Sequence, residues 1–392
     1  MIVSMAHYPT HNYFVSCAPG LEQLLAGELR TLRCRSVRPQ RMGVLFKGTI
    51  KDGYRVCLWS RFASRVLLKI AQLDIVSDAR FYNEVLQLPW ETHLRPDGTL
   101  YITSIGSNEI FRNTQFINVR VKDAIVDRFR ALKKKRPNIT SKHPDLQLHV
   151  VMRKKYAQIF IDFASEPLHR RHYRAKEVQV VAPMKETLAA AVVTWGGWPR
   201  IAATGAPFVD FMCGSATLPI EAAMIAGDIA PGLLRKRWGF DRWVQHDKVA
   251  WERLVDEAQN RRERGLASIP PIYASDISPA HVNIARYGIR QVGLEDYITL
   301  SQDDFIEVTR PESSVPGLIA LNPPYGERML EKDELPPLYE YLRETLDGYW
   351  DGYRLALITP DQTISAHLGL SPIHTHPVLN GRIETNVYTY DL

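Results

Sequence analysis

Residues 208–226 read FVDFMCGSATLPIEAAMIA, and this stretch decides the fold of the second half of the chain. The apolar run Phe208–Phe211 predicts a buried strand, and the apolar run Leu218–Ala226 predicts a helix. A glycine turn at Gly214 joins them, where backbone N–H groups at a helix start can approach a ligand. The turn lacks the G-x-G-x-x-G spacing of nicotinamide-binding loops.

The same alternation of strand and helix continues on both sides of this stretch. Strands are predicted at 272–275, 298–300, 317–321 and 354–359, and helices at 185–195, 279–291 and 338–346. Such alternation predicts an α/β, Rossmann-like domain with a doubly wound parallel sheet. Asn380-Gly381, between apolar runs at 377–379 and 384–390, is a two-residue hairpin signal, so we expect the sheet to end in an antiparallel hairpin.

The first half of the chain has a different pattern, which predicts a small α+β assembly. Strands are predicted at 44–46, 66–73, 99–104, 146–152 and 158–163, and helices at 21–30, 54–60 and 114–132. The basic, poorly periodic stretch LHRRHYRAK, Leu168–Lys176, is interpreted as a domain linker.

Composition restricts the class of protein. The chain has 392 residues, 45% of them hydrophobic and 23% charged, which is typical of a soluble protein of two or three domains. No apolar run reaches the roughly 18 residues of a membrane span, and residues 1–10 do not resemble a secretory signal. The four cysteines lie far apart without a C-x-x-C pair, which argues against disulfides and fits a reducing cytoplasm. The histidines are scattered, so no metal site is predicted.

The positive charge is concentrated in the middle of the chain. Residues 110–180 contain 17 Lys and Arg against 6 Asp and Glu, whereas the whole chain has a net charge of +6. This concentration suggests a polyanionic partner, although a solvated helical face would have the same composition. The candidate RNA-binding residues are Lys133, Lys134, Lys135, Arg136, Arg153, Lys154 and Lys155.

Acidic residues follow three successive predicted strands, where a nucleoside cofactor would bind. Asp210 suits a cationic ligand such as the sulfonium or amino end of S-adenosylmethionine, and Asp276 can accept both ribose hydroxyls. Asp304, preferred over its neighbour Asp303, can accept the adenine amino group, while Phe305 shields the ring. A structural turn, a surface acid and a helix cap are the respective alternatives. The candidate cofactor residues are Asp210, Met212, Cys213, Gly214, Ser215, Thr217, Asp276, Ile277, Asp304 and Phe305.

The most specific motif is Asn322-Pro323-Pro324-Tyr325, directly after an apolar strand. An exocyclic amine is a poor nucleophile because its lone pair is delocalised into the base. The Asn322 side-chain oxygen and the Pro323 carbonyl can accept its two N–H groups and so localise the lone pair. Pro324 restricts the turn, and Tyr325 can stack on a flipped-out base. The alternative is a Pro-Pro turn that only ends a strand.

These residues resemble those of the class I methyltransferases. The strings LHRRHYR (168–174), APMKETL (182–188), PIEAA (219–223) and IAPG (229–232) are similar to the THUMP-containing guanine-N2 RNA methyltransferases. LWSR (58–61), RNTQF (112–116) and VKDAI (121–125) resemble the branch that modifies bacterial 23S, large-subunit rRNA. The resemblance covers nearly the whole chain.

The resemblance implies S-adenosylmethionine as cofactor and an RNA partner. It implies an N-terminal ferredoxin-like region at 1–60, a THUMP RNA-binding domain at 61–166, a linker at 167–180 and a methyltransferase domain at 181–392. Asn322, Pro323 and Tyr325 would hold the target guanine. Because the sequence ends soon after the presumed last strand, we expect no second fused methyltransferase domain and only the guanine-N2 activity.

Two features depart from the family pattern or extend it. Ala216 stands where the family usually has a second glycine, which puts close packing on the cofactor in doubt. The charged, helical segment 228–270 is an insertion between the glycine loop and Asp276 that we expect to be an RNA-contact candidate.

Four other functions stay open at this stage. The Asn-Pro-Pro-Tyr chemistry also suits a DNA adenine-N6 methyltransferase or a protein-glutamine methyltransferase. A tRNA guanine-N2 methyltransferase is the nearest competitor, because the choice of rRNA rests on the resemblance alone. A non-catalytic RNA-binding assembly factor would keep the fold but would not need Asp210, Asp276 and Asn322, so the presence of these residues argues against it.

Overall fold

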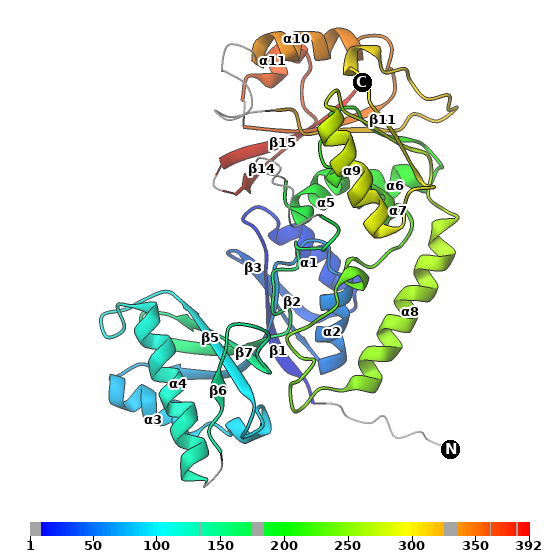
Figure 1. Cartoon of the computed structure of the whole chain (residues 1–392). Helices are drawn as coiled ribbons and strands as arrows, with labels where there is room; N and C mark the ends of the chain where they lie inside the picture. The colour runs from blue at the N-terminus through cyan, green and yellow to red at the C-terminus, as the bar shows by residue number, and fades with distance from the viewer. Residues whose placement is uncertain (1–8, 133–134, 175–183, 325–334, 361, 382) are drawn as a thin grey trace. The chain divides into compact units, whose positions relative to one another are not determined.

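The computed structural model describes residues 9–132, 135–174, 184–324, 335–360, 362–381 and 383–392. The chain divides into two compact units (Figure 1). The first unit contains residues up to Cys17, Leu25–Leu168 and Arg235–Leu254, and the second contains Ala18–Leu24, His169–Leu234 and Val255–Leu392. Within the described ranges no helix is both long and apolar enough to cross a membrane.

The first unit is built on an eight-stranded sheet of order β2-β3-β1-β4-β8-β7-β5-β6. The strands are β1 (His11–Ser16), β2 (Arg35–Gln40), β3 (Gly43–Gly48), β4 (Arg65–Asp74), β5 (Thr99–Ile105), β6 (Asn138–Ile139), β7 (Leu146–Met152) and β8 (Tyr156–Asp162). Strand β5 pairs in parallel with β6 and β7, and the other pairs are antiparallel. The sheet is therefore continuous from the expected ferredoxin-like region into the expected THUMP region.

Helix α2 (Ile50–Trp59) shows how local sequence and packing agree in this unit. Thr49 and Asp52 form a reciprocal capping box at its start, which satisfies two backbone donors. Gly53 faces the sheet, and a Cβ there would lie 2.8 Å from the Tyr13 ring. Tyr13 in turn stacks on Phe46, with ring centroids 4.6 Å apart. Glycine at this position therefore allows the helix to lie directly on the aromatic core.

The other helices of this unit are α1 (Glu22–Thr31), which begins in the second unit, α3 (Asp78–Gln87) and α4 (Thr114–Ala131). The expected strands and helices of the first half are present within a few residues, but β1, β2, β6 and α3 were not predicted. Strand β2 reads RSVRPQ, in which charge and proline hide the strand signal.

Residues 235–254 belong to the first unit although they follow the glycine loop in sequence. The Phe240 ring lies 4.3 Å from the Tyr54 ring and 5.4 Å from the Phe163 ring. The Gly239 N–H donates to the Phe163 carbonyl at 2.9 Å. Residues 235–254 of the 228–270 insertion thus contribute aromatic side chains to this core. Helix α8 (Lys248–Leu266) then leads into the second unit.

The second unit contains a seven-stranded sheet of order β11-β10-β9-β12-β13-β15-β14. The strands are β9 (Phe208–Asp210), β10 (Ile272–Ser275), β11 (Ile298–Ser301), β12 (Leu318–Leu321), β13 (Arg354–Thr359), β14 (His374–Asn380) and β15 (Ile383–Asp391). The first five strands of this order are parallel, and β15 is antiparallel to both β13 and β14. The predicted doubly wound sheet and its final hairpin are confirmed.

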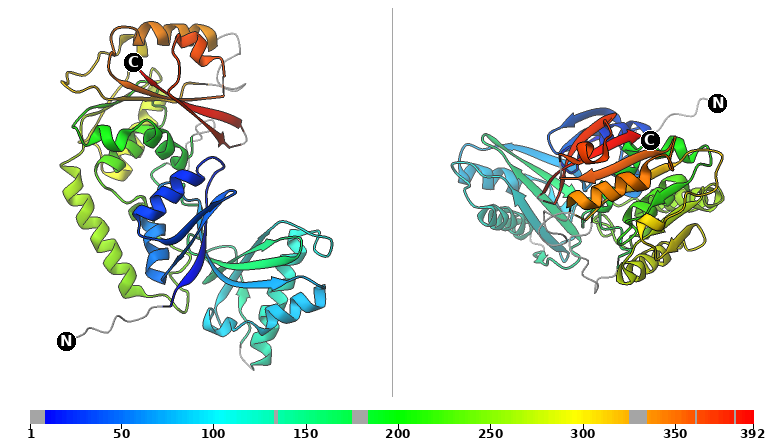
Figure 2. Two further views of the ribbon diagram at one scale, coloured as in Figure 1. Left: turned by 180° about the vertical axis from the view of Figure 1, so that it is seen from behind. Right: turned by 90° about the horizontal axis from the view of Figure 1, so that it is seen from above.

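Helices cover both faces of this sheet. In Figures 1 and 2, α10 (Leu335–Leu346) and α11 (Ile364–Leu368) lie on one side, and α5 (Glu186–Trp195), α7 (Thr217–Ala226) and α9 (Pro279–Val292) lie on the other. The side chains of successive strand residues point alternately to these two layers of helices. Val209 and Ile319 pack with Tyr339 in the core beneath α10, whereas Phe208 contacts the Trp198 ring of α6 (Trp198–Ala202), 5.2 Å away. The strand order reverses between β9 and β12, where open α/β sheets bind ligands.

Candidate active site

A cavity of about 410 Å³ lies where strands β9, β10 and β12 of the second unit end. Its volume is within the range of small-molecule and cofactor sites. All ten predicted cofactor residues line it, together with Asn322 and Pro324. Pro323 is buried beside them, and Tyr325 lies outside the described residues.

Asp210 is a buried carboxylate at the end of β9. Its side chain is almost wholly excluded from solvent, and its Oδ1 accepts the Met212 N–H at 3.1 Å. Burial raises the pKa of Asp210 well above its usual range, the Met212 N–H opposes that rise, and the charge of Asp276 adds to it. No ion pair to Asp210 exists within the described part of the chain. A cation bound in the cavity would compensate the negative charge of this carboxylate. The sulfonium of S-adenosylmethionine is such a cation.

The glycine loop adopts a conformation that ordinary side chains rarely take. Gly214 has φ +53°, and Ala216 has φ +56° at the start of α7. The Ala216 methyl group is fully buried, so the departure from glycine places an alanine in a strained left-handed backbone. It does not line the cavity, whereas its neighbours Ser215 and Thr217 do.

Asp276 connects the loop to strand β10. Its Oδ2 accepts the Gly214 N–H at 2.8 Å, and its Oδ1 accepts the Ser278 N–H at 3.0 Å. The His281 Nδ1 also lies 3.1 Å from Oδ1. A carboxylate oxygen has two lone pairs, so Oδ2 keeps one acceptor position for a ligand hydroxyl. His281 and Ser278 line the cavity but were not predicted, because their position depends on the turn after β10.

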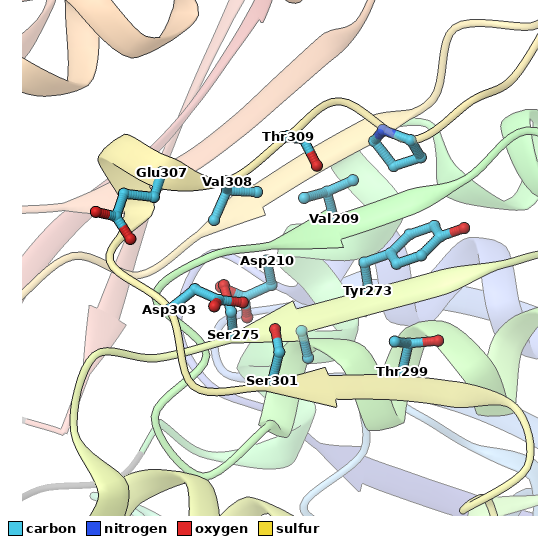
Figure 3. Close-up of a pocket in the computed structure, with 12 residues that line it drawn as sticks. Val209, Asp210, Tyr273, Ser275, Thr299, Ser301, Asp303, Glu307, Val308 and Thr309 are labelled. Atoms are coloured by element: carbon cyan, nitrogen blue, oxygen red, sulfur yellow. The ribbon is translucent and has the colours of Figure 1, made fainter.

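The two neighbouring acids after β11 face different cavities. Asp304 lines the main cavity, and its Oδ1 accepts the Ile306 N–H at 3.2 Å as the cap of a short 3₁₀ helix. Asp303 instead lines a smaller cavity of about 290 Å³, where Figure 3 shows it beside Asp210 and Ser275. Asp304 therefore caps a turn and lines the main cavity at once, whereas Asp303 does not line the main cavity.

Asn322 carries the feature most informative about chemistry. Its Oδ1 is buried without any hydrogen-bond partner among the described residues, and the residue lines the cavity. An unsatisfied buried acceptor costs about 1–3 kcal/mol, and a ligand that brings a hydrogen-bond donor into the cavity would remove that cost. The residues present thus fit S-adenosylmethionine and an amino group beside it.

Arg174, from the expected linker, contacts the wall of the cavity. Its Nη2 donates to the Thr217 Oγ1 at 2.8 Å and to the Met184 carbonyl. The Ser215 and Thr217 hydroxyl oxygens are 3.1 Å apart. Met184, Ser215 and Thr217 all line the cavity, and sequence reasoning missed Met184 and the Arg174 contact.

The structure does not bring the predicted RNA-binding residues together. Lys133 and Lys134 lie outside the described residues, and Lys135 and Arg136 are exposed after α4, next to the start of β5. The exposed run Arg153, Lys154 and Lys155 forms the β7–β8 turn. Because β5 and β7 are parallel, this turn lies at the other end of the sheet.

Much of the positive charge of residues 110–180 is also neutralised in three dimensions. Arg120 pairs with Asp78 at 2.7 Å, and Arg128 pairs with Glu91 at 2.7 Å. Both acids lie outside the counted segment. The local charge surplus therefore overstates the free positive charge of this surface.

Comparisons with known proteins agree with this architecture. A family model described as the RMKL-like methyltransferase domain matches residues 171–389. A model of the RlmL ferredoxin-like domain matches residues 12–67, and a THUMP domain model matches residues 78–162.

Similar whole proteins and a solved structure point the same way. The chain is 38% identical over 382 residues to the ribosomal RNA large subunit methyltransferase K/L of Syntrophotalea carbinolica, a match that covers 97% of this chain and 53% of that protein. For the protein of the same name from Magnetococcus marinus the identity is 42% over 364 residues, covering 92% and 50%. The chain thus spans about half the length of these curated relatives. The crystal structure of SMU.472 complexed with SAH superposes with a TM-score of 0.85 at 27% identity, covering 97% of this chain and 98% of that chain.

Proposed function

This chain belongs to the RMKL-like methyltransferase domain family, and from that premise we propose that it methylates the exocyclic N2 amino group of a guanine in RNA. We propose S-adenosylmethionine as the methyl donor and large-subunit rRNA as the substrate. The names of the curated relatives support the rRNA substrate, and the SAH complex of a structural neighbour supports the cofactor.

The unpartnered Asn322 Oδ1 is the observation that carries the proposal. Asn322 lines the same cavity as the buried Asp210 carboxylate. One cavity therefore contains an oxygen that can accept an amine N–H and a carboxylate that can bind a cation. This combination suits transfer from a cationic donor to an amine. A turn that only ends a strand does not require a buried acceptor that lines the same cavity as a buried carboxylate.

The residues of the chain have distinct tasks in this reaction. When bound, S-adenosylmethionine supplies an electrophilic methyl group. Asn322 Oδ1 and the Pro323 carbonyl accept the two amino N–H groups and direct the nitrogen lone pair at that methyl. One N–C bond forms as one S–C bond breaks, and the amine then releases a proton to solvent. Asp210 and Asp276 position the cofactor, and the protein needs mainly to align and desolvate the reactants.

The test measures transfer of labelled methyl groups to rRNA, tRNA, DNA and protein, with nucleoside mass spectrometry of the product. We expect N2-methylguanosine in large-subunit rRNA. Asn322→Ala is expected to keep its affinity for the cofactor but to lose about 100-fold or more in kcat, because only the orientation of the guanine amino group is disturbed. Gln291→Ala, an exposed change near the end of α9, is the control. Undiminished turnover by Asn322→Ala, or label in DNA or protein alone, contradicts the proposal, and label in tRNA alone reassigns the substrate.

A further inference from the structure

A second basic segment in the first unit contains no acidic residue. Between Glu28 and Asp52 the sequence has seven Lys and Arg and no Asp or Glu. Six of the seven lie from the end of α1 to strand β3 and are exposed: Arg30, Arg33, Arg35, Arg38, Arg41 and Lys47. No side chain of these six forms an ion pair or hydrogen bond with another described residue. This differs from α4, whose cations are largely paired.

A β-bulge arranges three of these cations on one face of the sheet. Arg35 lies opposite Lys47, and Arg38 lies opposite Leu45, with a register shift between them. Arg35 and Arg38 are three residues apart, yet their partners are two apart, so both share the face of Lys47. Ser36, within the bulge, has φ +53°, a left-handed conformation that is costly for serine. The hairpin therefore combines two destabilising features, the strained backbone of Ser36 and the like charges of Arg35 and Lys47 directly opposite each other.

The cations lie on the face of the sheet that α2 does not cover. Val44 and Phe46 are buried on the side of Tyr13, against which α2 packs. Lys47 alternates with them and therefore points to the opposite face, where its neighbour Asn12 is exposed. Strand β2 is also the edge strand of the eight-stranded sheet. Arg35, Arg38 and Lys47 are therefore accessible from the edge of the sheet and from the face that α2 does not cover.

We propose that the β2–β3 hairpin binds the phosphate backbone of the RNA substrate. This surface, defined by Arg35, Arg38, Arg41 and Lys47, is called the hairpin surface. The inference rests on the proposed function for the identity of the polyanion. The planar guanidinium groups of three arginines suit bidentate contacts with phosphate oxygens. Such contacts fix the register of an RNA without reading its sequence.

The composition of the hairpin surface favours a nucleic acid over an acidic protein. Stable protein interfaces are centred on a buried apolar or aromatic cluster. The exposed large apolar side chain at this hairpin is Met42, at the β2–β3 turn, 49% exposed. Phosphate binding requires cations alone, because its free energy comes largely from release of counterions.

The experiment compares four forms of the full chain, the wild type and three variants. The test variant carries Arg35→Gln, Arg38→Gln and Lys47→Gln, and the control carries the exposed changes Arg200→Gln, Arg286→Gln and Arg290→Gln. Both lose three positive charges. Fluorescence anisotropy with a labelled 20-base-pair RNA hairpin and with a transcript of large-subunit rRNA gives Kd at several salt concentrations. Calorimetry with S-adenosylmethionine reports whether the second unit is intact.

We expect the test variant to bind RNA at least about tenfold more weakly at low salt, with a shallower salt dependence by about two to three units of slope. The control is expected to retain most of its affinity. A variant with Arg35→Lys and Arg38→Lys keeps the charge but loses the bidentate geometry, so we expect its affinity to lie between those of the wild type and the test variant. Unchanged affinity and slope overturn the inference. In that case increased self-association would show that the charges protect a sheet edge, and lost binding to poly-glutamate would indicate an acidic protein partner.

Failure of this inference can be told apart from failure of the proposed function. If the wild-type chain transfers methyl groups to RNA while the test variant binds RNA normally, only the hairpin surface is refuted. If the wild-type chain neither binds nor methylates RNA, the proposed function is itself refuted.

Discussion

Arg171 and Glu221 form an ion pair that is excluded from solvent. The Arg171 Nε and Glu221 Oε1 atoms are 3.3 Å apart, and the two side chains are 1% and 0% exposed. Arg171 belongs to the basic stretch that the sequence suggested as a linker, and Glu221 lies on α7, directly after the glycine loop. The pair thus anchors the start of the second unit to the helix that supports the cavity.

Breaking this pair is expected to destabilise the second unit strongly. Arg171→Met leaves Glu221 buried and uncompensated, so the free energy of unfolding should fall by about 3–5 kcal/mol in urea titrations. The double change Arg171→Met and Glu221→Met should recover most of that loss, because no buried charge remains. Arg200→Met, an exposed change, should alter stability by less than about 0.5 kcal/mol. A single variant as stable as wild type would show that the pair contributes little.

Asp210→Asn should separate stability from cofactor binding. Burial raises the pKa of Asp210, so the ligand-free fold loses stability as pH rises from the unfolded pKa, near 4, through the raised folded pKa. The asparagine variant lacks this loss, so its advantage in melting temperature over the wild type should grow as pH rises above the unfolded pKa. Its affinity for the sulfonium cofactor should be lower and no longer increase with pH. Equal pH dependence of both proteins would refute this role of the carboxylate.

Asp276 is expected to bind the cofactor ribose, and a cycle that combines one substitution with one ligand analogue can isolate that contact. Asp276→Ala should weaken S-adenosylhomocysteine binding about 10- to 100-fold, because a hydrogen bond to a charged group is lost. The wild-type protein should prefer the ribose form over its 2′-deoxy analogue, and the variant should bind both alike. If the variant keeps the full preference, Asp276 acts only through its bond to the Gly214 N–H.

Gly239 should be essential for packing residues 235–254 into the first unit. A Cβ at this position would lie 2.0 Å from the Asp162 carbonyl oxygen, so the backbone would have to move. Gly239→Ala is expected to cost at least about 1–3 kcal/mol of stability. Gly27→Ala, in α1 with open space around it, should instead be neutral or stabilising by up to about 1 kcal/mol. Chemical denaturation of the three proteins checks both expectations, and equal stability of the two variants contradicts them.

The candidate site was largely predictable because its parts are local in sequence. Asp210, Asp276 and Asn322 each end a strand of a parallel sheet, and the carboxyl ends of such strands meet at one edge. The strand pattern therefore indicated their proximity without any contact being known. His281 and Arg174 could not be found this way, because their contacts depend on one turn and on one buried linker.

The sequence by itself determined the two fold types, most of the strands and helices, and the positions of the acidic residues and Asn322 at strand ends. Periodicity records which side of a strand or helix is buried, and turn residues record where the chain reverses. Tertiary structure alone decided which partner each buried or charged side chain meets. Phe240 packs on Tyr54, Asp78 neutralises Arg120, and Glu221 holds Arg171, each across more than forty residues of sequence. No local pattern encodes such a partner, because its identity depends on how distant segments pack together.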